Sequence, residues 1–124
     1  MNGKIELSGE IIRSAIEVHR LQGPGMLEKT YKLALSHELQ CKGFRVETEV
    51  PITLCYKELI IPNAYFMDLV VEEEVVVELK SIEQLGPMHH AQLLTYLRHS
   101  GMSLGLLMNF HEPILKNGIR RVVN

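Results

Sequence analysis

The sequence lacks the features of a membrane protein or an exported protein. Stretches free of Lys, Arg, Asp and Glu are short, and residues 85–97, one of the longer ones, fall well below the ~20 apolar residues that a transmembrane helix requires. Near the start of the chain, the apolar core that a signal peptide needs is interrupted by Lys4, Glu6 and Glu10. We therefore expect a cytoplasmic protein with no membrane segment.

Cysteine and basic charge are also scarce. The two cysteines, Cys41 and Cys55, are too few to make a metal site, and without an export signal we expect both to be reduced thiols. Lys and Arg number 13 against 15 Asp and Glu, which gives a formal net charge of -2. Proteins that bind nucleic acid through global electrostatics are normally basic. A nucleic-acid partner would therefore need a local basic patch or a bridging metal ion.

What the sequence does contain is the composition of an ordinary globular domain. Hydrophobic residues make up 46% and charged residues 23% of the 124 residues, which excludes a disordered chain. We find no internal repeat, low-complexity tract or linker. The length suits one hydrophobic core, so we expect residues 1–124 to form a single domain.

Apolar periodicity predicts three helices and a group of strands. The helices are expected over residues 8–21, with Ser8 as the cap, over residues 26–43, and from the Gly86-Pro87 pair to Gly101. Alternation predicts a strand over residues 44–50, which residues 51–56 extend or repeat, and further strands over residues 59–61, 65–71, 74–80, 104–110 and 119–123, with turns at 57–58 and 72–73. This order indicates a mixed sheet flanked by helices, in an α/β or α+β fold.

Three polar residues stand out within the predicted strands. Asp68 interrupts an apolar strand, while Glu78 and Lys80 are two residues apart and so leave the same face of the next strand. If the turn at 72–73 pairs the strands, the two carboxylates lie close together and repel unless a cation such as Mg²⁺ lies between them. The alternative is a strand with one wet face and cross-strand charge pairs, which the spacing alone does not exclude.

These residues resemble the signature of a nuclease superfamily. Asp68 followed by Glu78-x-Lys80 is similar to the PD-(D/E)xK motif, whose core has the order α-β-β-β-α-β. The run from Gln92 to Tyr96 resembles the QxxxY motif of the RecB-like branch, and Gly25-Met26-Leu27-Glu28-Lys29-Thr30-Tyr31 matches the pattern of the GxxExxY family. The resemblance extends from about residue 8 to residue 124.

The resemblance implies a set of active-site residues. It makes Asp68 and Glu78 the metal-binding carboxylates, the carbonyl of Leu79 a further ligand, Lys80 the catalytic lysine and Glu28 an acidic residue that orders the site. Without the resemblance, Glu28 is equally well explained by the dipole of the helix that it begins.

The resemblance also concerns contacts with a substrate. Gln92 and Tyr96 are four residues apart on one helix face and would hold the substrate backbone, although Tyr96 also suits a core aromatic. Phe66 stands where many relatives carry an arginine, so a phosphate contact is missing there. We therefore expect a Mg²⁺- or Mn²⁺-dependent nuclease acting on DNA or RNA, and a homodimer is an open possibility. The alternative is a binding module that retains the nuclease fold without catalysis.

Overall fold

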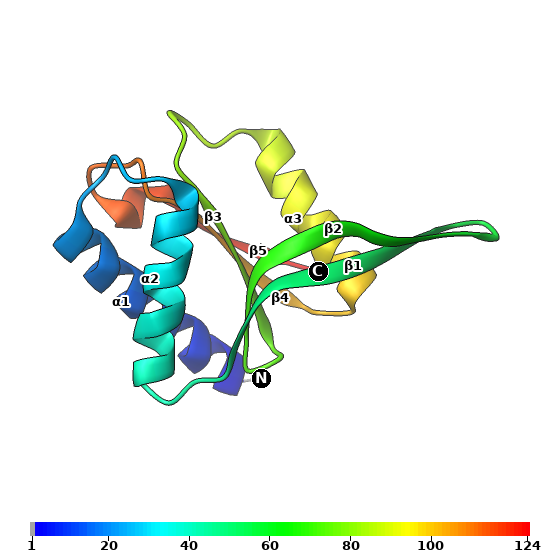
Figure 1. Ribbon diagram of the computed structural model, residues 1–124, viewed down its shortest axis with the longest axis horizontal. Coiled ribbons are helices and arrows are strands. Elements are labelled where there is room, and N and C mark those ends of the chain that lie inside the picture. Colours follow the sequence, from blue (N-terminus) through cyan, green and yellow to red (C-terminus); the bar gives the residue numbers. More distant parts are fainter. Residues whose placement is uncertain (1) are drawn as a thin grey trace.

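Residues 2–124, which the computed structural model describes, form three α-helices, one short 3₁₀ helix and five strands (Figure 1). In chain order they are α1 (Asn2–Gln22), α2 (Glu28–Cys41), β1 (Val46–Tyr56), β2 (Leu59–Val71), β3 (Val75–Lys80), α3 (Pro87–Ser100), β4 (Leu104–Asn109), η1 (Leu115–Gly118) and β5 (Ile119–Val123). None of the described helices is both long and apolar enough to cross a bilayer.

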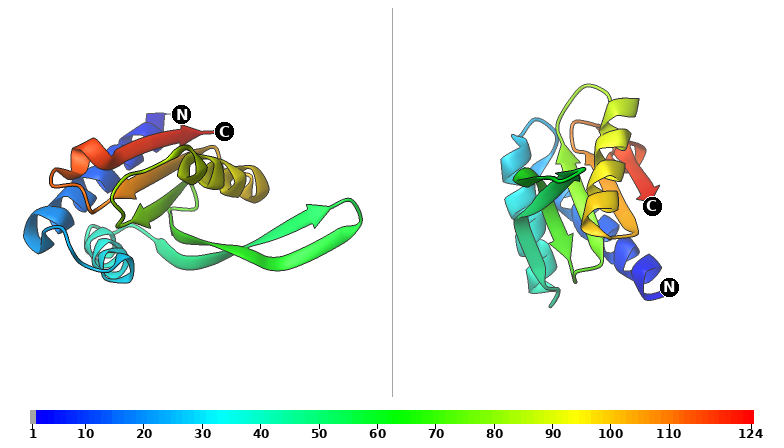
Figure 2. Two further views of the ribbon diagram at one scale, coloured as in Figure 1. Left: turned by 90° about the horizontal axis from the view of Figure 1, so that it is seen from above. Right: turned by 90° about the vertical axis from the view of Figure 1, so that its right-hand side faces the viewer.

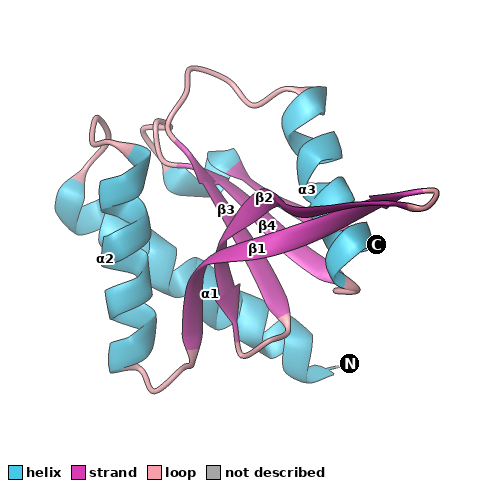
Figure 3. Ribbon diagram, turned by 45° about the vertical axis from the view of Figure 1, so that its right-hand side comes forward, coloured by secondary structure: helices cyan, strands magenta, loops and turns pink. Residues whose placement is uncertain are grey.

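The five strands make one mixed sheet in the order β1-β2-β3-β4-β5. Strands β1, β2 and β3 form an antiparallel meander, β4 lies parallel to β3 after the crossover through α3, and β5 returns antiparallel to β4. The helices α1 and α2 cover one face of the sheet, and α3 covers the other (Figures 2 and 3). From α2 to β4 the elements follow the expected α-β-β-β-α-β order, which confirms the α/β fold class.

The core consists of two apolar layers that share the central strand. Val75, Val77 and Leu79 pack against α1 and α2, whereas Val76 packs against α3, because successive side chains of a strand point to opposite faces. Residues 75–79 are all buried, so β3 is covered on both sides. This explains the nearly continuous apolar run of β3, which is typical of a strand with two covered faces.

Several predicted boundaries are confirmed by the local chemistry. The turn between β2 and β3 is formed by Glu72 and Glu73, whose φ angles are 53° and 56°, as a tight turn of two left-handed residues requires. Helix α3 ends before Gly101, which adopts the left-handed conformation with φ 75°. The last strand spans the residues that alternation predicts.

Helix α1 is longer than the sequence pattern predicts, and the capping role of Ser8 is wrong. The helix begins at Asn2, so Ser8 lies inside it. The Ser8 hydroxyl donates to the carbonyl of Ile5 at 2.8 Å and accepts a hydrogen bond from Arg121 of β5. The first turns are held by tertiary contacts, among them the 2.9 Å hydrogen bond from the Lys4 ammonium to Ser103. Local periodicity does not contain these contacts.

Residues 51–56 extend the first predicted strand, and the segments predicted at 59–61 and 65–71 join into one long strand. Strands β1 and β2 pair as a hairpin and extend beyond the sheet as an arm, here defined as residues 53–64 (Figure 2). Their register shifts between Ile52 and Leu54, and Asn63 opposite this shift has a φ of 53°. The arm exposes large apolar side chains, namely Tyr56, Leu59, Ile60 and Ile61.

Candidate functional site

Three carboxylates form a row across β1, β2 and β3. The antiparallel register of β1 and β2 places Glu49 opposite Asp68, which is the only aspartate of the sequence. The regular pairing of β2 with β3 ends at Leu69 and Val77, and the next position aligns Asp68 with Glu78. Glu49 and Glu78, which are 29 positions apart in the chain, thus lie in one row on either side of Asp68 because the meander folds back twice.

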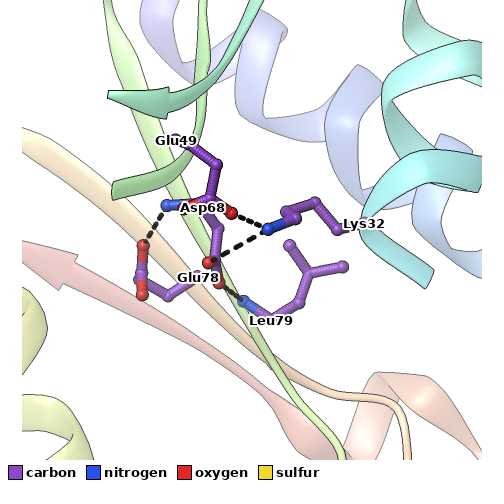
Figure 4. A network of polar contacts seen from close by, with 5 residues as sticks. All are labelled: Lys32, Glu49, Asp68, Glu78 and Leu79. Atoms are coloured by element: carbon purple, nitrogen blue, oxygen red, sulfur yellow. Dashed lines mark hydrogen bonds and ion pairs between the residues drawn. The ribbon is translucent and has the colours of Figure 1, made fainter. Parts of the chain in front are cut away.

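Asp68 and Glu78 are joined by hydrogen bonds that replace the backbone ladder (Figure 4). The backbone amide of Asp68 donates to Oε2 of Glu78 at 2.7 Å, and the amide of Leu79 donates to Oδ2 of Asp68 at 3.0 Å. Each carboxylate is therefore fixed by a backbone amide of the neighbouring strand. The expectation that the two acids lie on the same side of paired strands agrees with this geometry.

Burial makes the ionised form of this pair costly. Glu78 is only 4% exposed, and its burial, followed by the charge of Asp68, raises the pKa of Glu78 to about 8. Burial also raises the pKa of Asp68, against the effect of the hydrogen bond from Leu79 and of nearby Lys32 and Lys80. At neutral pH the pair therefore holds a proton even beside Lys32 and Lys80, unless a further cation neutralises it.

A lysine from α2 lies against the row of carboxylates. The ammonium of Lys32 contacts the carboxylate of Glu49 and lies 4.0 Å from Oδ1 of Asp68 (Figure 4). The Lys32 side chain is only 14% exposed, although Glu49 is half exposed. The sequence analysis missed both residues. The position of Lys32 one helical turn after Glu28 is a signal that could have identified it, because residues four apart share a helix face.

Lys80 lies beside the acidic pair. It follows Glu78 by two residues on β3, and its charge lowers the pKa values of both Asp68 and Glu78. The backbone of Lys80 is held by β4, since its carbonyl accepts a hydrogen bond of 2.8 Å from the amide of Phe110. Within residues 2–124 the ammonium has no hydrogen bond or ion pair of its own.

Glu28 reaches the carboxyl end of β3 from the first turn of α2. Its Oε2 atom accepts a hydrogen bond of 3.2 Å from the backbone amide of Ser81, and the Ser81 hydroxyl donates to the carbonyl of Met26 at 3.2 Å. The charge of Glu28 contributes to the raised pKa of Asp68, and no hydrogen bond is found between the two carboxylates in the described part of the chain.

Gln92 and Tyr96 line a pocket of about 220 Å³ together with Tyr65, Met88, Ala91 and Thr95. The ring of Tyr96 lies 5.5 Å from that of Tyr65, measured between centroids. Burial, followed by the charges of Glu78 and Asp68, raises the pKa of Tyr96 to about 12, so its hydroxyl stays protonated. A larger pocket of about 900 Å³ lies along α1 and contains none of the predicted site residues.

The donor atoms suit a hard divalent cation. Among the residues that the structure describes, no group of three or more His, Cys, Asp or Glu side chains is arranged to hold a metal ion. Asp68 and Glu78 nevertheless bring carboxylate oxygens together with excess negative charge, which is what Mg²⁺ and Mn²⁺ prefer. Leu79 directs its amide to Asp68, so its carbonyl faces the same strand edge. The residues present thus fit a cation at the Asp68–Glu78 pair, with Glu28 outside it.

A further polar residue that the sequence analysis missed holds the segment that follows Lys80. Asn109 at the end of β4 is 1% exposed, and its Nδ2 donates to the carbonyl of Ile82 at 2.8 Å. Its Oδ1 accepts from the amides of Ile82 and His111 at 3.1 and 3.2 Å. Asn109 therefore ties the segment after Lys80 to β4. A buried asparagine in an apolar strand is the signal that could have identified it.

Comparisons with known proteins point to one family. The model of the PD-(D/E)XK nuclease superfamily matches residues 5–122 of the chain. Comparison with curated proteins and with solved structures gives no match.

Proposed function

The chain belongs to the PD-(D/E)XK nuclease superfamily, and on this premise we propose that it hydrolyses phosphodiester bonds of DNA or RNA with the help of Mg²⁺ or Mn²⁺. The observation that carries the proposal is the pairing of Asp68 with Glu78. Glu78 is buried and Asp68 is partly buried, and two such carboxylates with raised pKa values destabilise a metal-free protein, a cost that a divalent cation removes.

Asp68, Glu78 and the carbonyl of Leu79 would hold the cation. When bound there, it would neutralise charge on the phosphate and favour the attack of water on phosphorus. Glu28 lies close enough to influence Asp68 and keeps the end of β3 in position through Ser81.

Lys80 contributes the second positive charge of the site. Its ammonium is near both carboxylates and is not engaged in an ion pair within the described chain, so it is free to orient the attacking water or to contact the phosphate. Charge that develops on the phosphate in the transition state is stabilised by a donor held in this way.

Tyr96 and Gln92 would bind the substrate from α3. The pocket that they line also contains Tyr65 and Thr95, and the charges of Glu78 and Asp68 contribute to the raised pKa of Tyr96. A protonated Tyr96 hydroxyl is able to donate to a phosphate oxygen, and Tyr65 next to it offers an aromatic face.

Membership of the GxxExxY branch is part of the proposal. The motif residues act together in the structure: Gly25 has a φ of 105°, and the Tyr31 hydroxyl donates to the carbonyl of Gly23 and accepts from the amide of Met26 at 3.1 Å. They fix the loop from which Glu28 begins α2. We also propose a cytoplasmic location, which suits the free thiols of Cys41 and Cys55.

The second candidate is a non-catalytic binding module. The observation in its favour is Lys32, whose ammonium already compensates Asp68 without a metal ion. A net charge of -2 also provides little general attraction for nucleic acid.

The test is metal-dependent digestion of a panel of DNA and RNA by wild type, Lys80→Ala and Lys80→Arg. Lys80→Ala should lower cleavage by on the order of 10²-fold while Mn²⁺ binding persists, because it removes one transition-state donor. Lys80→Arg should restore little, since a planar guanidinium places its charge differently.

Lys29→Ala is the matched control, because Lys29 is exposed on α2. Wild-type cleavage by Lys80→Ala would place the activity in another site or in a contaminant. Absence of cleavage by wild type with either metal would favour the binding module.

A further inference from the structure

Lys32 occupies an unusual position for a lysine. Its side chain is 14% exposed, and it reaches from α2 to the row of carboxylates, where it lies 4.0 Å from Oδ1 of Asp68 (Figure 4). Tyr31, the preceding residue, is fully buried and anchors this turn of the helix in the core. The Lys32 ammonium is thus held at the carboxylates by the helix that carries it.

The charge of Lys32 acts on the same two groups that fit a divalent cation. It lowers the pKa values of Asp68 and Glu78, which burial raises. An ammonium and a divalent cation that share one carboxylate repel each other, and this repulsion is strong where water is partly excluded. Lys32 therefore competes with a metal ion for Asp68.

Glu49 gives Lys32 a second partner outside the acidic pair. The half-exposed carboxylate of Glu49 contacts the Lys32 ammonium, and Glu49 lies opposite Asp68 on the adjacent strand. The Lys32 ammonium would thus keep its ionic contact with Glu49 when Asp68 binds a divalent cation. A buried lysine that lost its only partner would be costly.

We propose that Lys32 is the counter-cation of Asp68 in the metal-free protein. A divalent cation that binds Asp68 is repelled by the Lys32 ammonium, and this repulsion lowers the metal affinity of the site. This inference rests on the proposed metal site at Asp68 and Glu78. Lys32 acts through Asp68 and is therefore a positioning residue, whereas the ligands are the carboxylates themselves.

A purely structural ion pair would behave differently. If Lys32 only fastened α2 to the sheet, its removal would loosen the carboxylates and weaken metal binding or leave it unchanged. If it competes with the metal, its removal strengthens metal binding although it destabilises the metal-free protein. The direction of the change in affinity separates the two roles.

The experiment is calorimetric titration of Mn²⁺ into wild type, Lys32→Met, Lys32→Gln, Lys32→Arg and Lys29→Met. Lys32→Met and Lys32→Gln should bind Mn²⁺ on the order of ten-fold more tightly, because they remove a cation beside the metal while keeping most of the side chain. Lys32→Arg should bind no more tightly than wild type, and Lys29→Met, exposed on the same helix, should match wild type. Circular dichroism and thermal melts in EDTA identify any variant that fails to fold.

The outcomes separate this inference from the proposed function. If wild type binds Mn²⁺ and neither neutral variant binds it more tightly, the competition is refuted while the metal site stands. If wild type does not bind but a neutral variant does, Lys32 is the dominant block and the inference is supported. If no folded variant binds Mn²⁺, the proposed metal site fails and the inference fails with it.

Discussion

The backbone amide of Asp68 donates a hydrogen bond of 2.7 Å to the carboxylate of Glu78, so that a side chain takes the place of the next backbone rung between β2 and β3. The carboxylate of Asp68 in turn accepts from the amide of Leu79 at 3.0 Å. The two acids are therefore held together by the sheet itself. Burial and mutual repulsion make the ionised form of the pair costly, so a cation that binds there stabilises the folded protein.

The first prediction concerns pH and Glu78→Gln. The Glu78 pKa is raised from 4.5 to about 8, so between these values the folded protein keeps a proton that the unfolded chain has lost. The contribution of this proton to stability is complete below pH 4.5 and disappears as the pH rises through about 8. Glu78→Gln should lack this loss and be more stable than wild type by about 1–3 kcal/mol at pH 9.

Urea unfolding in EDTA at pH 4.5, 7 and 9 measures the difference between the two proteins. Glu47→Gln on the exposed part of β1 is the control, because it removes a carboxylate from β1 without touching the pair. A difference that stays constant with pH would mean that Glu78 is ionised throughout.

The second prediction concerns metal removal and Asp68→Asn. Addition of Mn²⁺ should raise the melting temperature of wild type at neutral pH, with a stabilisation of about 2.7 kcal/mol at 100 times the dissociation constant. EDTA should reverse the effect. Asp68→Asn should still accept the hydrogen bond from Leu79 through its amide oxygen but lose the response to Mn²⁺. An equal response of Asp68→Asn and wild type would exclude Asp68 as a ligand.

The third prediction concerns Asn109. Replacement by alanine removes three hydrogen bonds and leaves the partly buried amide and carbonyl of Ile82 without their partner. Unsatisfied groups of this kind should lower the free energy of unfolding by about 2–4 kcal/mol, as chemical denaturation would measure. Asn117→Ala, at an exposed position, should change stability by less than about 0.5 kcal/mol. Similar stabilities for the two variants would show that Asn109 does not hold the segment after Lys80.

The fourth prediction concerns Tyr31→Phe. The Tyr31 ring stacks on Phe110 with centroids 4.5 Å apart, and its hydroxyl binds the backbone of Gly23 and Met26. Phenylalanine keeps the stacking but leaves two backbone groups without their partner, which should cost about 1–2 kcal/mol. Tyr56→Phe on the exposed arm is the control and should be neutral in the same thermal melts. Equal melting temperatures would show that water replaces the hydroxyl without cost.

The order of the elements and the identity of the paired acids follow from local sequence patterns. The apolar run of β3 and the acidic turn at Glu72 and Glu73 define a hairpin, and the hairpin brings Asp68 opposite Glu78 through local pairing alone. Strand alternation and turn residues reveal such a hairpin, because strand and turn formation here depend on residues only a few positions apart in the chain.

The remainder of the acidic row and the course of the longest strands depend on contacts between elements that are distant in the chain. Lys32 meets Glu49 and Asp68 because α2 packs across the sheet, a contact between elements that no periodicity encodes. The arm joins segments that alternation divides, because cross-strand hydrogen bonds carry β1 and β2 past the register shift at Ile52. The local sequence pattern indicates which face of a helix or strand is apolar, whereas the packing of helices against the sheet determines which charged side chains come into contact.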